Sequence, residues 1–149
     1  MTVKILAELF QRDLLKLKEE INLYADEAKL WVIDKEIKNS AGNLALHLAG
    51  NLKHFIGVVL GDSGYVRNRE AEFTDKNIPR HEIIKSIDET SAIIHLVLNK
   101  MSDADLEKEY PLEVLKYKGR MTAEFFLVHL YGHLNYHLGQ VNYHRRLLK

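Results

Sequence analysis

The strongest constraint on the fold is a helical repeat of apolar residues in four stretches, about residues 3–28, 40–60, 79–101 and 122–149. Spacings of three and four place these side chains on one face of a helix. In the first stretch they are Ile5, Leu6, Leu9, Leu14, Leu17, Ile21 and Tyr24. Because each helix must bury its apolar face against another, the pattern predicts an all-α fold, an antiparallel four-helix bundle.

Residues that favour helix starts and loops divide the four stretches. Ser40 and Thr122 are expected to cap the second and fourth helices with their hydroxyl oxygens, and Pro79 is expected at the first position of the third. The highly charged residues 65–77 (YVRNREAEFTDKN) predict a long loop after the second helix. Residues 102–120 predict an irregular or hairpin-like crossover before the fourth helix, from Pro111, Gly119 and the alternating Tyr110, Leu112, Val114 and Tyr117.

Composition removes several functional classes. The 149 residues carry 21 Lys and Arg against 21 Asp and Glu, and a net charge of zero gives no general attraction for nucleic acid or anionic lipid. The apolar stretches are too short to span a bilayer, and the first residues are charged too often for a secretory signal. We therefore expect one cytoplasmic domain over residues 1–149, with a small molecule rather than nucleic acid or a membrane as its partner.

The chain contains no cysteine. This excludes disulfides, thiolate metal sites and a cysteine nucleophile. A bound metal must therefore rest on nitrogen and oxygen ligands, and any thiol chemistry must use a thiol that comes from outside the chain.

Histidine is concentrated towards the end of the sequence, at His129, His133, His137 and His144. His133 and His137 lie one helical turn apart on one face, which is a common half-site for a divalent metal. The apolar second helix offers His47 as a third ligand, and burial there would keep the imidazole neutral. The alternative for His47 is a buried histidine bonded to a carbonyl group.

The other histidines fit such a site less well. His54 lies two turns from His47, which is too far to share its ion, so we expect it beside the site or on the surface. His129 is a substitute ligand, while His81, His95 and His144 are expected to be structural or exposed.

Residues near these histidines are candidates for substrate contact or for support of the ligands. Asn51, Tyr136 and Gln140 could bond a ligand, a water or a substrate, or could form ordinary contacts between helices. Arg67 and Arg69 could hold a carboxylate or phosphate, or could belong to a solvated loop with internal ion pairs.

Three apolar or small residues complete these expectations. Phe73 is expected to anchor the charged loop. Gly50 and Gly139, which are unfavourable inside helices, are expected to let the second and fourth helices pack closely.

The motifs NLALHLAGN, with His47, and HLNYHLGQ, with His133 and His137, together with YVRNREAEF, make the chain resemble the DinB-like (YfiT-like) metalloenzyme superfamily, in a branch of unknown function. The resemblance covers nearly the whole chain. It implies an antiparallel four-helix bundle, a site for nickel or zinc on His47, His133 and His137, and frequently a homodimer. Better-understood members are metal-dependent transferases of small thiols, or isomerases that use them.

Three functional hypotheses follow. The first is a metal-dependent enzyme that activates a low-molecular-weight thiol or water against a small molecule, as a transferase or hydrolase. The second is a non-catalytic metal-binding or dimeric scaffold protein, because the ligand motifs contain no carboxylate that could act as a general base. The third is a metal-free bundle with histidines in its core.

Overall fold

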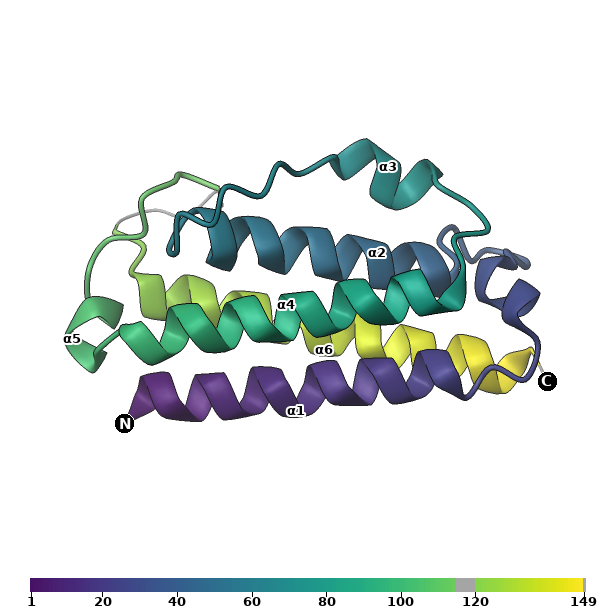
Figure 1. The fold of residues 1–149 in the computed structure, drawn as a ribbon, viewed down its shortest axis with the longest axis horizontal. Coiled ribbons are helices and arrows are strands. Elements are labelled where there is room, and N and C mark those ends of the chain that lie inside the picture. Colours follow the sequence, from purple (N-terminus) through teal and green to yellow (C-terminus); the bar gives the residue numbers. More distant parts are fainter. Residues whose placement is uncertain (115–119, 149) are drawn as a thin grey trace.

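The computed structural model describes residues 1–114 and 120–148, and these residues form an all-α fold without a β-strand (Figure 1). The long helices are α1 (Thr2–Asn22), α2 (Ala41–Leu52), α4 (Arg80–Lys100) and α6 (Ala123–Leu147). The shorter elements are the 3-10 helix η1 (Glu27–Trp31), the π-helix η2 (Lys53–Val58), α3 (Arg69–Thr74) and α5 (Asp103–Leu106). No helix in the described ranges is long and apolar enough to cross a membrane.

The four long helices share one apolar core. α1 packs against α4 and α6, and α2 packs against the same two helices. Leu17, Leu48, Ile87 and Leu130, one from each long helix, are almost completely buried in this core. Most residues of the predicted apolar repeats therefore do form the interior. Ile5 of the first repeat and Phe125, Val128 and Leu147 of the fourth are exceptions, because they are exposed.

The direction of the helices follows from their connections. α1 and α6 run towards one end of the molecule, and α2 and α4 run towards the other (Figure 1). α2 and α4 can share a direction because the segment between them, which contains α3, returns along the length of the molecule (Figure 1). This return lays α3 over α2, where the two helices are in contact.

Side-chain caps fix two predicted helix starts. The Ser40 hydroxyl accepts a hydrogen bond from the Asn43 N–H at 3.2 Å, and the Thr122 hydroxyl accepts one from the Phe125 N–H at 3.1 Å. Pro79, expected inside the third helix, is instead the residue before it, since α4 begins at Arg80. The second helix continues to Val58, but as a π-helix after Leu52.

Three predicted segments differ from the structure. The first helix ends at Asn22 instead of position 28, because the Asp26 side chain accepts a bond from the Ala28 N–H and starts η1. The predicted loop 65–77 contains α3, which Asn68 caps by accepting from the Ala71 N–H. The crossover 102–120 contains α5, which was not predicted, but the antiparallel bridge from Glu109 to Thr122 agrees with a hairpin-like crossover. Tyr117 and Gly119 lie outside the described residues.

Candidate metal centre

Three imidazoles from two helices converge in the middle of the fold. His47 lies on α2, and His133 and His137 lie one turn apart on α6. The Nε2 atoms of His47 and His133 are 3.2 Å apart, and those of His133 and His137 are 3.1 Å apart. One ligand atom from each of the three residues lies within 4.8 Å of the other two, so this group can hold one metal ion.

Two of the imidazoles are oriented by acceptors at their other nitrogen. His47 Nδ1 lies 3.0 Å from Glu72 Oε1, and His137 Nδ1 lies 2.7 Å from Gln140 Oε1. An ionised carboxylate can only accept, so the proton of His47 sits on Nδ1 and the Nε2 lone pair faces the cluster. The same tautomer follows for His137. Histidines held in this way are typical metal ligands.

The environment keeps two imidazoles neutral. Burial, followed by the charges of neighbouring histidines, lowers the pKa of His133 to about 4. Burial also lowers the pKa of His137, although the Gln140 hydrogen bond opposes this change. Neutral imidazole is the form that binds metal, so His133 and His137 each offer a nitrogen lone pair at pH 7.

Glu72 is the residue that connects this cluster to α3. It is buried, and it accepts hydrogen bonds from Arg67 Nε at 2.8 Å and Arg67 Nη2 at 2.9 Å in addition to His47. Burial alone would raise the pKa of Glu72, but the hydrogen bonds from His47 and Arg67 outweigh burial and lower it. The carboxylate is therefore ionised when it orients His47.

The two glycines near the ligands have different surroundings. A Cβ on Gly50 would overlap the Glu72 carboxylate, so this glycine makes room for Glu72 rather than for α6. A Cβ on Gly139 would meet nothing within 4 Å. The expectation that both glycines let the second and fourth helices approach is therefore wrong, because neither lies at their contact.

A model of the family described as "Protein of unknown function (DUF1572)" matches residues 4–149. The chain belongs to the DUF1572 family. No curated protein matches the sequence. The family description names no activity.

The predicted substrate contacts of the DUF1572 chain have different surroundings. The Tyr136 ring lies 5.3 Å from the ring of His137 and is largely exposed, whereas Asn51 is buried and its Oδ1 has no hydrogen-bond partner among the described residues. Arg67 forms an ion pair with Glu72, which agrees with the second interpretation given for Arg67, an ion pair within its own segment. Arg69 lies over the Phe73 ring at 5.3 Å. Substrate contact by these residues stays a prediction.

The remaining histidines of the DUF1572 chain lie outside the cluster, as expected. His129 stacks on Phe126, and His144 bonds the Tyr24 hydroxyl at 2.6 Å and the Val32 carbonyl at 2.8 Å. His54 lies against Phe55, His95 bonds Asn99, and His81 is exposed.

The role of Glu72 could not be seen in the sequence analysis, because Glu72 lies in the charged segment 65–77 that was predicted to be a loop. The available signal was Asn68 as a helix cap, because a helix from Arg69 brings Glu72 and Phe73 to the bundle. Phe73 does anchor this segment, with its ring 4.8 Å from that of His47.

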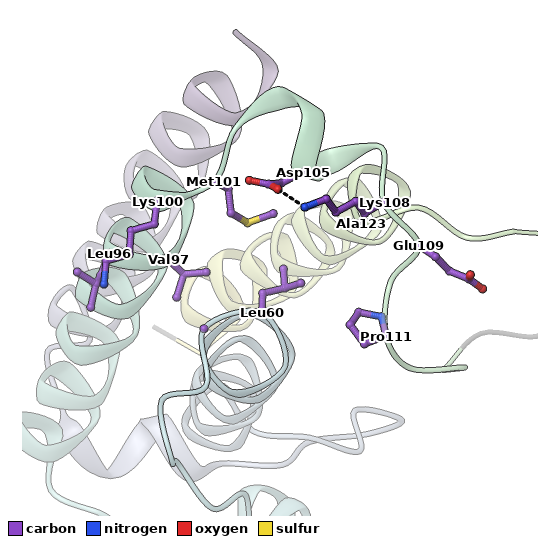
Figure 2. A pocket seen from close by; sticks show the side chains of 11 residues that line it. Leu60, Leu96, Val97, Lys100, Met101, Asp105, Lys108, Glu109, Pro111 and Ala123 are labelled. Atoms are coloured by element: carbon purple, nitrogen blue, oxygen red, sulfur yellow. Dashed lines mark hydrogen bonds and ion pairs between the residues drawn. The ribbon is translucent and has the colours of Figure 1, made fainter.

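Two cavities lie along the described part of the DUF1572 chain. One, of about 820 Å³, is lined by Leu44, Gln140, His144 and the 34–39 segment. Gln140 contacts His137, but none of the three clustered histidines lines this cavity. The other, of about 420 Å³, lies where α4 meets α5 and has none of the three clustered histidines in its wall. Figure 2 shows Asp105 and Lys108 paired at the edge of this second cavity, 2.7 Å apart.

Proposed function

We propose that the chain is a DinB-like (YfiT-like) metalloprotein that holds one divalent ion, nickel or zinc, on His47, His133 and His137. The packing of α1, α2, α4 and α6 around one core supports the four-helix bundle of that superfamily, with α1 and α6 running against α2 and α4. The observation that carries the proposal is the convergence of three Nε2 atoms from two helices. All-nitrogen ligation suits nickel and zinc better than magnesium or calcium.

The function we infer is a metal-dependent transferase or hydrolase that acts on a small molecule. When bound, an ion with three imidazole ligands keeps open positions at which it lowers the pKa of a thiol or water. Because the sequence has no cysteine, the thiol of a transferase reaction would be a low-molecular-weight cosubstrate.

The residues of the chain would provide the framework for this chemistry. Glu72 and Gln140 hold the imidazoles of His47 and His137 in place. The cavity of about 820 Å³ beside Gln140 has the size of a small-molecule site. Tyr136, which lies against His137, is a candidate to contact the substrate, as are Asn51, Arg67 and Arg69.

Turnover by tag-free protein loaded with nickel or zinc tests this function. We expect one small thiol among a panel to be transferred to an electrophile, or one ester or amide to be hydrolysed. The rate should vanish in the His137→Ala variant and in metal-stripped wild type, and should return when metal is added back to the wild type. Consistent inactivity of fully loaded protein across the panel would contradict the enzyme hypothesis.

A non-catalytic metal-binding scaffold is the second candidate. It is favoured by the contacts of Glu72, because this carboxylate already accepts from both His47 and Arg67 and is not free to act as a general base. Stoichiometric metal without any turnover would support this candidate.

A further inference from the structure

The outer face of α6 carries a continuous row of exposed residues, which we call the α6 row. Its apolar and aromatic members are Val128, Tyr136, Tyr143 and Leu147, which are 52%, 66%, 64% and 72% exposed. Two exposed glycines, Gly132 and Gly139, complete the row. Steps of three and four residues keep all six on one side of the helix, next to the side that carries His133 and His137.

The two glycines in the row serve no contact in the described part of the chain. A Cβ at either position would meet nothing within 4 Å. Glycine destabilises the interior of a helix, so two exposed glycines in one helix indicate a contact with another molecule. Close approach of another helix, with large side chains over the glycines, would supply that contact.

The order of residues in the row identifies that other helix. Val128 and Leu147, Gly132 and Tyr143, and Tyr136 and Gly139 lie at equal distances on either side of a point between residues 137 and 138. If a second α6 packs antiparallel about that point, every tyrosine faces a glycine of the other copy. Such self-complementarity is what a two-fold interface requires.

We propose that two copies of this chain associate through their α6 rows, antiparallel, with Tyr136 and Tyr143 of each copy packed over Gly139 and Gly132 of the other. The ends of α6 carry opposite charges, with Glu124 in the first turn and Arg145 and Arg146 in the last turn. Antiparallel packing brings unlike ends together, and it also aligns the helix dipoles favourably.

This arrangement has a consequence for the candidate metal centre. Tyr143 and Leu147 also line the cavity of about 820 Å³, together with Gln140, which contacts His137. The second copy would therefore border this cavity. The association itself does not depend on bound metal, so its test is separate from the test of the metal site.

Cysteine cross-linking tests the register directly, because the natural chain has no cysteine. The antiparallel register places residue 132 of one copy opposite residue 143 of the other, within disulfide reach. Like residues are then about 16 Å apart along the helix, since they are offset by 11 residues. We expect an oxidised dimer when the Gly132→Cys and Tyr143→Cys variants are mixed, and none from either variant alone. Cross-linking of either variant with itself, or no cross-linking of the mixture, would overturn the register.

Sedimentation of the full chain tests the association. Gly132→Leu and Gly139→Leu should leave the helical circular dichroism intact, because both positions are open, but should raise the dimer dissociation constant about tenfold or more. Ala92→Leu, at an exposed position on α4, is the matched control and should leave the dimer dissociation constant unchanged. A wild-type chain that is monomeric at about 0.1 mM, or a dimer that tolerates both glycine variants, would contradict the proposal.

Discussion

Among single residues, Glu72 joins most parts of the candidate metal centre. Its carboxylate orients His47, pairs with Arg67 and occupies the space left by Gly50. Acceptors behind a metal-binding histidine fix the ring and make the ligand nitrogen more basic. The affinity for metal should therefore depend on a residue that would not itself touch the ion.

Glu72→Gln should lower the affinity for nickel or zinc about 10- to 100-fold, because the amide still contacts His47 but loses the negative charge. Competition with a chromophoric chelator measures this change. Glu70→Gln is the matched control, since Glu70 is an exposed carboxylate on the same short helix. Equal affinities of the wild type and the Glu72 variant would show that Glu72 does not support the ligands.

Asp13 is a second residue whose charge is fixed by its neighbours. It is fully buried on α1, and it accepts from the Tyr131 hydroxyl at 2.5 Å, from Asn135 Nδ2 at 3.1 Å and from Arg12. Burial would raise the pKa of Asp13, but the hydrogen bonds prevail and hold this pKa well below its usual range. The ionised carboxylate therefore joins α1 to α6.

Asp13→Asn should lower the free energy of unfolding at pH 7 by about 1–3 kcal/mol. Because the folded pKa lies below the unfolded value of about 3.9, the carboxylate stabilises the fold above that pH and this contribution is lost as the pH falls through the folded pKa. Urea unfolding at several pH values should show the difference between wild type and variant narrowing below about pH 4. A difference that does not change with pH would contradict the role given to this carboxylate.

Among the elements, α3 is the one that completes the candidate metal centre. It is six residues long, and it brings Glu72 and Phe73 onto α2 beside His47. Gly50 leaves the space that Glu72 of α3 occupies, because any larger residue at position 50 would overlap the Glu72 carboxylate. The position of α3 and the orientation of His47 are therefore linked.

Gly50→Ala should weaken metal binding about tenfold or more by displacing Glu72, even though alanine favours the helix itself. Ala92→Leu, at an exposed position on α4, is the control. Isothermal titration with nickel or zinc separates the two variants. Retention of wild-type affinity by Gly50→Ala would mean that α3 does not set the geometry of the ligands.

The long helices and the meeting of the three histidines could be predicted from the sequence, whereas α3 and its carboxylate could not. Apolar repeats reveal helices that run over several turns, and the spacing of His133 and His137 follows from one turn of such a helix. α3 is too short to show a repeat, and its charged residues look like a loop. The bond between His47 and Glu72 also joins residues 25 positions apart, so it depends on the return of the chain over α2.

For the whole molecule, metal binding should be linked to stability. The cluster is formed by α2 and α6, which are far apart in the sequence, so the unfolded chain offers no equivalent site. An ion at about 100 times its dissociation constant would stabilise the folded chain by about 2.7 kcal/mol.

Chelation should therefore lower the melting temperature of the metal-loaded chain by about 5 °C or more, and added nickel or zinc should restore it. Scanning calorimetry measures this shift, with the His137→Ala variant as the control that should not respond to chelator. An unchanged melting temperature of the wild type would favour the metal-free bundle.

The direct test of the central claim is the stoichiometry of metal binding by tag-free, metal-stripped protein titrated with nickel or zinc. We expect one ion per chain, lost in His47→Ala, His133→Ala and His137→Ala but retained in His54→Ala and His129→Ala. Absence of stoichiometric binding by the wild type, or full retention in any of the three ligand variants, would contradict this claim.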